Sequence, residues 1–290
     1  MLSFFANLFG YILNGIYLVI KNYGLAIILF SILIKLFLLP LSIKQQKTMK
    51  KSAKLQEKMK EIQFKYKNNP EKLNQETMNL YKSENMSPFS GCLSAIVQLV
   101  LLFSVFYLVR SPLTYMKKVD SQLIENYANE IKQEMPEEFN SAYPEISIIQ
   151  HKGAEDERVY LNMDFLGIDL SKVPTQDLND PRVYIIPVLY VISSFISMKI
   201  TANAQVKKNE KKDIIIEGET EETKQEMNEV DAVAQANKSM SYIMPIMSIS
   251  IAIVAPLGLA LYWLMSNILL IFERLILDKY FNSKEEEENA

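Results

Sequence analysis

One charged residue stands inside a long apolar run near the start of the chain. Residues 25–43 contain Lys35 as their only charge, and the next charged residue is Lys44. In a helix rising about 1.5 Å per residue, this spacing places Lys35 roughly 13 Å from the polar end. A lysine at that depth costs roughly 2.5–3.5 kcal/mol to insert into a membrane, so it indicates a functional site. Such a lysine could attract a negatively charged group into a membrane.

Polar residues that could surround Lys35 recur at helical spacing. Gly24, Ser31 and Ser42 share its helix face at 100° per residue. We find no Asp or Glu inside the apolar segments to pair with Lys35, so we expect water in a cavity to solvate it. The candidate groove residues are Lys35, Ser31, Gln98, Ser94, Tyr262, Trp263, Ser266 and Asn267, with Ser193, Ser194 and Ser197 offered by a further segment. For each serine and glycine, the alternative is ordinary small-residue packing between helices.

Membrane-spanning helices must position these residues. The 290-residue chain is 49% hydrophobic and 22% charged, with the two kinds of residue sorted into separate segments. A span needs about 17–25 mostly apolar residues, and a long run can divide at a Pro-Gly turn such as Pro256-Leu257-Gly258. The predicted spans are 23–43, 88–110, 183–200, 240–255 and 257–273. The predicted fold class is therefore an all-α polytopic membrane protein with a five-helix transmembrane core.

Residues 1–22 are predicted to form an N-terminal interfacial helix. The polar and small residues recur at alternating steps of four and three, which places them on one helical face. These residues are Ser3, Asn7, Gly10, Asn14, Tyr17 and Lys21. Such a face suits a helix that lies in the membrane interface. The alternative is a sixth spanning helix.

The distribution of basic residues predicts the orientation. Residues 44–87 hold 11 basic and 5 acidic side chains, whereas residues 111–182 hold 7 basic and 14 acidic ones. Basic loops stay in the cytoplasm. We therefore expect 44–87, 201–239 and the acidic tail 274–290 to be cytoplasmic, and 111–182 to be an extracytoplasmic loop. The N-terminus is then outside and the C-terminus inside.

Residues 44–87 are predicted to form a cytoplasmic hairpin of two amphipathic helices. Asn69 is a suitable N-cap for the second helix, with Pro70 at its first position and Glu71 in its first turn. The surplus of lysine suits anionic lipid head groups or a nucleoprotein surface, which favours a docking or gating element. The alternative is a solvated tether. The residues singled out for the hairpin are Lys54, Lys58, Lys65 and Pro70.

Enzymatic chemistry has little support in this sequence. One Cys and one His leave no Cys/His metal site, and we assign no catalytic residue, metal or cofactor. A Gly-x-x-x-x-Gly-Lys-Ser/Thr nucleotide loop is absent from the sequence. A transporter or channel subunit is the main alternative, although such proteins usually contain internal repeats and we find none.

Several stretches together resemble the YidC/Oxa/Alb family of membrane protein insertases, and its Gram-positive bacterial members in particular. The stretches are residues 24–46, 61–74 and 88–93, Asp180-Pro181 with Pro187, and residues 256–267. In this order they touch nearly all the predicted spans and the hairpin turn.

The resemblance implies a membrane insertase in the bacterial plasma membrane. In that family five helices enclose a hydrophilic groove that is open to the cytoplasm and lipid and closed to the outside. Lys35 corresponds to the family's groove charge, which would attract acidic residues in the outer tail of a nascent membrane protein without nucleotide hydrolysis. The implied partners are nascent membrane protein clients, the ribosome and signal recognition particle pathway, the Sec translocon and membrane lipids. Direct nucleic-acid recognition is not expected.

The sequence departs from the family pattern in four places. Lys35 replaces the usual Arg, which keeps the charge but loses the planar fork. Gln98 is followed by Leu99-Val100, where many relatives have a Pro. About fifty extra residues precede Tyr160 in the acidic outer loop. The tail ends in four glutamates, 285–288, so we expect weaker ribosome binding through the tail.

Overall fold

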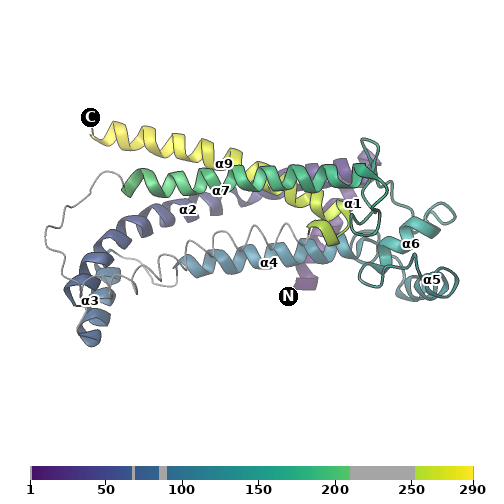
Figure 1. The fold of residues 1–290 in the computed structure, drawn as a ribbon, viewed down its shortest axis with the longest axis horizontal. Coiled ribbons are helices and arrows are strands. Elements are labelled where there is room, and N and C mark those ends of the chain that lie inside the picture. Colours follow the sequence, from purple (N-terminus) through teal and green to yellow (C-terminus); the bar gives the residue numbers. More distant parts are fainter. Residues whose placement is uncertain (1, 67–68, 85–89, 210–251, 290) are drawn as a thin grey trace.

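The protein is a bundle of long helices with a smaller folded segment at one end (Figure 1). The computed structural model describes residues 2–66, 69–84, 90–209 and 252–289. Its helices are α1 (Leu2–Ile20), α2 (Tyr23–Lys65), α3 (Pro70–Ser83), α4 (Ser90–Arg110), α5 (Ser121–Glu134), α6 (Pro144–Lys152), α7 (Ile185–Asn209) and α9 (Leu257–Asn289). Shorter elements are the π-helical turn η1 (Leu113–Lys117), the strands β1 (Asp164–Phe165) and β2 (Ile168–Asp169), and the 3₁₀ turn η2 (Pro181–Tyr184).

The predicted all-α polytopic fold class is confirmed. Within the described residues, four helical segments are long and apolar enough to cross a membrane. They are Leu2–Ile20, Tyr23–Thr48, Pro181–Ile200 and Leu257–Phe281. The described apolar part of α4 is shorter, Leu99–Arg110. Of the predicted span 240–255, residues 240–251 lie outside the described residues, as do residues 210–239 of the predicted cytoplasmic loop.

Three helices run past the boundaries that the sequence pattern placed within them. Helix α7 continues beyond the predicted span 183–200 as far as Asn209. Helix α2 carries both the predicted span 23–43 and the first half of the hairpin as one helix. Pro40 lies inside it, and the Lys-, Gln- and Glu-rich turns that follow are good helix formers. Helix α9 likewise continues through the predicted tail 274–290 as far as Asn289. A change from apolar to polar composition therefore marks no helix end here.

The loops lie at opposite ends of the bundle. Helices α5 and α6 occupy one end of the long axis, and α3 and the C-terminus occupy the other (Figure 1). This arrangement puts segment 111–182 on one side of the helices and the hairpin of α2 and α3 on the other. The relative placement agrees with the alternation predicted from the basic residues.

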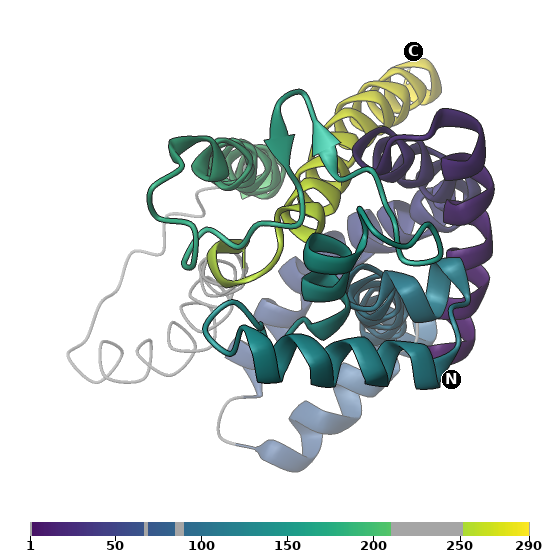
Figure 2. The same cartoon turned by 90° about the vertical axis from the view of Figure 1, so that its right-hand side faces the viewer.

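Helix α1 crosses the bundle instead of running along it. It lies across the direction of α2, α4 and α9 in both views (Figures 1 and 2). This is the orientation of a helix lying in an interface plane, although α1 is also long and apolar enough to span. Its buried side chains, Phe9 and Leu13 among them, join the same core as α2 and α4.

The buried core belongs mainly to the end of the bundle that carries α5 and α6. On α2 the buried apolar residues run from Tyr23 to Ile34, and on α9 from Leu257 to Leu264. On the described part of α4 they are Val105, Leu108 and Val109. Further along each helix, buried apolar residues become sparse among those described, with Leu55, Leu277 and Phe281 the remaining ones on α2 and α9. Dense packing therefore ends at about the level of Lys35.

Gly10 on α1 allows a close approach that a larger residue would prevent. A Cβ atom at this position would lie 1.9 Å from the carbonyl oxygen of Tyr115 in η1. Gly15 on the same helix has no atom within 4 Å of the equivalent position. The two glycines therefore form a matched pair for testing how α1 packs.

We predict that Gly10→Ala lowers the thermal stability of the purified protein and Gly15→Ala does not. Overpacking at Gly10 should cost about 1–3 kcal/mol. Alanine at position 15 should add about 0.5–1 kcal/mol through helix propensity. Thermal unfolding in one detergent measures both variants. Equal melting temperatures for the two would contradict the contact between α1 and η1.

Candidate functional site

An ion pair joins two of the long helices. The Nζ atom of Lys35 on α2 contacts the Oε2 atom of Glu273 on α9. The Lys35 side chain is 25% exposed and that of Glu273 is 8% exposed. Our expectation that no acidic residue pairs with Lys35 is therefore wrong. Because α9 continues past the apolar run, the first residue after that run, Glu273, still packs against α2.

The carboxylate of Glu273 is only partly satisfied. Its Oε1 atom is buried and has no hydrogen-bond partner among the described residues. Removing one partner from a buried pair costs about 3–5 kcal/mol, because the other charge is then uncompensated. Glu273 therefore depends on Lys35, and the pair as a unit carries no net charge.

Further contacts join α2 to α9 beyond the ion pair. The amide nitrogen of Gln46 donates to Oδ1 of Asp278 at 2.8 Å. The ammonium group of Lys47 lies 5.9 Å from the centre of the Phe281 ring. The two helices are thus joined by polar side chains along the part that the apolar core does not fill.

Predicted groove residues on α7 and α9 contact each other. The amide nitrogen of Asn267 donates to the hydroxyls of Ser193 at 3.0 Å and Ser194 at 3.1 Å. Both serines are buried. The rings of Tyr190 and Trp263 lie 6.1 Å apart on the same two helices. For Asn267 and these serines, the structure shows helix packing through hydrogen bonds.

The other candidate groove residues are satisfied within one helix, half-buried, or outside the described side chains. Ser31 is buried, and its hydroxyl donates to the carbonyl of Ile27 at 2.7 Å, so it is satisfied within its own helix. Tyr262 and Ser266 are half-buried on α9. Trp263 is also half-buried, and its Nε1 atom has no partner among the described residues. The side chains of Ser94 and Gln98 lie outside the described part of the chain.

Sequence reasoning missed Glu273, although a signal for it exists. Glu273 follows Ser266 by seven residues, which is about two helical turns, so the two share a face of α9. The predicted span 257–273 ends on Glu273 itself. Because Glu273 directly follows the uncharged run 257–272, hydropathy gives no sign that it packs against α2.

The hairpin residues are partly described. The predicted cap is confirmed, since the Asn69 side chain accepts from the backbone N–H of Lys72 and Pro70 begins α3. Lys58 forms an ion pair with Glu84, which joins the two helices of the hairpin. The ammonium group of Lys65 lies 5.5 Å from the Tyr66 ring. The side chain of Lys54 lies outside the described part.

Segment 160–182 binds the starts of α2 and α9. The backbone N–H of Tyr23 donates to the carbonyl of Asn162 at 3.0 Å, just before the antiparallel pair β1–β2. Leu257 and Gly258 donate to the carbonyls of Lys172 and Leu170, both at 2.9 Å. The first N–H groups of a helix have no partner within it, and here the outer segment supplies partners for two of them on α9.

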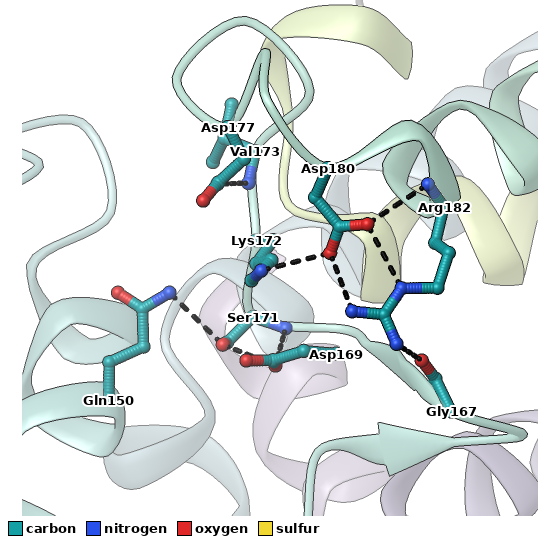
Figure 3. A network of polar contacts seen from close by, with 9 residues as sticks. All are labelled: Gln150, Gly167, Asp169, Ser171, Lys172, Val173, Asp177, Asp180 and Arg182. Carbon is teal, nitrogen blue, oxygen red and sulfur yellow. Dashed lines mark hydrogen bonds and ion pairs between the residues drawn. The ribbon is translucent and has the colours of Figure 1, made fainter.

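A polar network within the same segment fixes the start of η2, which directly precedes α7 (Figure 3). Asp180 accepts from Lys172 at 3.1 Å and from Nε of Arg182 at 3.0 Å. Arg182 also donates to the carbonyl of Gly167 in the turn between the two strands. Gln150 of α6 donates to Ser171 at 3.0 Å, which connects the network to the remainder of the outer segment. We name residues 111–182 the outer cap.

A buried carboxylate joins α6 to η1, the turn that follows the end of α4. Glu145 on α6 accepts from the backbone N–H groups of Leu113 at 2.7 Å and Thr114 at 3.0 Å, and from the Thr114 hydroxyl. Burial raises the pKa of Glu145, and the donors from Thr114 and Leu113 oppose that effect. The carboxylate thus satisfies the free backbone donors at the start of η1.

These features define a polytopic α-helical membrane protein with a capped end and a cation near the inner limit of its core. The family model described as 60Kd inner membrane protein matches residues 15–285. The chain therefore belongs to the YidC/Oxa/Alb family, as the sequence stretches predicted.

Individual relatives agree with this assignment. The chain is 29% identical to "Membrane protein insertase YidC 2" of Listeria innocua, over 99% of this chain and 71% of that protein. It is 31% identical to "Membrane protein insertase YidC" of Prosthecochloris aestuarii, over 90% of this chain and 34% of that protein. A segment of 92 residues is 51% identical to the Chlorobium limicola protein of the same name, over 32% of this chain and 16% of that protein. The chain thus spans about a third of the length of the Prosthecochloris protein.

We predict a pH-dependent effect of Asp180→Asn on the cap. Hydrogen bonds from Arg182, and then from Lys172, hold the pKa of Asp180 well below its usual range. A carboxylate with a lowered pKa stabilises the fold above its unfolded pKa of about 3.9, and this contribution is lost as the pH falls toward the folded value. The wild type should therefore melt above Asp180→Asn at pH 7, and the difference should shrink below about pH 4. An equal difference at pH 7 and pH 3 would contradict this ion-pair role.

Proposed function

We propose that the chain inserts membrane proteins into the bacterial plasma membrane. It would move short outer tails and hydrophobic segments of nascent clients from the cytoplasm into the bilayer, through a hydrophilic groove and without nucleotide hydrolysis. Membership of the insertase family supports the coarse function. The observation that carries the mechanism is the position of Lys35, a quarter exposed, where the packed core of the described residues ends.

The distribution of packing supports a groove that is closed on the outside. The outer cap supplies hydrogen bonds to the starts of α2 and α9, and the buried core fills the same end. Toward α3, buried apolar residues are sparse among those described on α2 and α9. A client tail would therefore enter from the cytoplasmic end, advance to the level of Lys35, and meet the packed core there.

Electrostatics and burial would supply the driving force. Lys35 would attract a carboxylate in the client tail, and an inside-negative potential assists the outward transfer of each negative charge by about 2.3 kcal/mol per 100 mV. The hydrophobic segment that follows would move into lipid, gaining about 25 cal/mol for each Å² of apolar surface removed from water. Exposed apolar side chains lie along this route on α2 and α7, among them Leu29, Leu33, Val188 and Ile192.

The orientation and the partners belong to the same proposal. The excess of lysine in the hairpin supports a cytoplasmic position for it, and the proposed orientation has the C-terminus inside and the N-terminus outside. Lys58 on the hairpin is exposed, as is the apolar ring of Phe64, so both are available to lipid head groups or a delivery partner. Ribosome, signal recognition particle and Sec translocon are the candidate partners, with the acidic tail weakening ribosome contact.

The first test replaces the cation. Lys35→Arg should retain insertion of a single-span client with an acidic outer tail, because the charge is kept. Lys35→Ala/Glu273→Gln, which removes both charges and leaves no buried carboxylate unpaired, should lower it about fivefold, as expected for a contact of about 1 kcal/mol. Protease protection of the client in liposomes, compared with empty liposomes, measures the yield.

Each outcome of this test has a distinct meaning. Equal insertion by all three proteins would keep the insertase function and reject the role of the cation. Protection no greater than in empty liposomes would reject the insertase proposal. Flux of small solutes through the same vesicles would then favour a transporter.

A second test addresses the hairpin. Deleting residues 51–82 removes the inner part of α2 and nearly all of α3 but leaves the buried core and the outer cap. We expect thermal unfolding in detergent to be little changed and client delivery to decrease several-fold. Unchanged delivery would favour the solvated tether, and loss of folded protein would show that the hairpin supports the core.

A further inference from the structure

We infer that Glu273 is a resident counter-ion that competes with client carboxylates for Lys35, and so determines how acidic an outer tail must be for insertion. This inference rests on the proposed insertase function and concerns the same site. It gives a role to a residue that the groove-charge mechanism leaves out.

Glu273 occupies the position that a client carboxylate would need. Its Oε2 atom contacts the Lys35 ammonium group, which has three N–H donors in all. The Lys35 side chain is 25% exposed, whereas that of Glu273 is 8% exposed. A second carboxylate would therefore reach the ammonium group from the open side of Lys35, while Glu273 contacts it from the α9 side.

The ion pair weakens the electrostatic attraction between Lys35 and an approaching client tail. Because the two charges cancel, an approaching acidic tail meets little long-range attraction. A client carboxylate binds Lys35 only when it shares the ammonium group with Glu273 or displaces Glu273 from it. Displacement exchanges one carboxylate for another at the same cation. Such an exchange is nearly balanced in energy, so a tail with several carboxylates succeeds where a tail with one or none does not.

The burial of Glu273 makes the exchange reversible. Its Oε1 atom is buried without a hydrogen-bond partner among the described residues, so beyond its contact with Lys35 the carboxylate has the electrostatic attraction of the adjacent Arg274. When a client tail leaves, Glu273 returns to the cation and restores the neutral pair. The same residue would therefore both discriminate between clients and release them.

A purely structural role is the alternative, in which the pair only fastens α2 to α9. The chain offers a matched control for this role. Asp278 on α9 also contacts α2, through Gln46 at 2.8 Å, whereas the acidic partner of Lys35 among the described residues is Glu273. If fastening is what matters, Glu273→Gln and Asp278→Asn should act alike, and on every client equally.

The test compares two clients that differ only in the outer tail. One tail carries several Asp and Glu residues, and the other has Asn and Gln in their places. Full-length wild type, Glu273→Gln, Asp278→Asn and Lys35→Ala/Glu273→Gln are reconstituted in liposomes, and protease protection gives the ratio of acidic-tail to neutral-tail insertion. We expect Glu273→Gln to raise this ratio about threefold, as for the loss of a partly exposed competing ion pair. Asp278→Asn should leave it unchanged, and the double variant should lose the gain.

Three results would contradict the inference and leave the proposed function unaffected. They are an unchanged or lowered ratio for Glu273→Gln, an equal rise for Asp278→Asn, or the same rise in the double variant that lacks Lys35. If Glu273→Gln does not fold, Glu273→Asp keeps the charge but shortens the side chain, and it should raise the ratio by less. An unchanged ratio in that variant would then reject the competition. Failure of the wild type to insert either client would instead reject the insertase function itself.

Discussion

The ion pair between Lys35 on α2 and Glu273 on α9 answers the main physical constraint on this protein, which is a charged side chain within an apolar helix. A lysine inside an apolar helix is costly unless something neutralises or solvates it. Here Glu273 neutralises it. Glu273 directly follows the apolar run of α9, and the helix continues beyond it. The same contact that makes Lys35 tolerable also limits its use as a bare charge. Any account of how the cation works therefore has to include the carboxylate.

The rest of the described bundle is organised by an asymmetry between its two ends. At one end the outer cap satisfies backbone donors at the starts of α2 and α9 and shares a continuous apolar core with the long helices. Toward the other end, side-chain contacts such as Gln46–Asp278 and Lys58–Glu84 join the helices while buried apolar residues are sparse among those described. A bundle that is densely packed at one end and has few buried apolar residues among those described at the other suits the proposed entry of a polypeptide from one side only.

The cap is held by apolar packing together with polar contacts. Its buried apolar residues, such as Met116, Ile131 and Leu170, belong to the main core. Glu145 on α6 accepts from the start of η1, 32 residues earlier in the sequence, and Asp180 fixes the local geometry around Lys172 and Arg182. Charged hydrogen bonds of this kind add specific geometry to the apolar packing. The acidic character of segment 111–182 is thus partly explained, since several of its carboxylates accept hydrogen bonds within the fold.

The sequence by itself determined the class of protein, the family, and the local signals of its helices. Apolar run lengths gave most of the spans, Asn69-Pro70-Glu71 gave the hairpin turn, and Lys35 stood out because one charge in a long apolar run is expensive. Only the tertiary structure decided which polar residues meet. Asn267 contacts the serines of α7, Ser31 bonds within its own helix, and Glu273 pairs with Lys35. Hydropathy is a property of one segment at a time, whereas a pairing depends on how two helices, here more than two hundred residues apart, pack against each other.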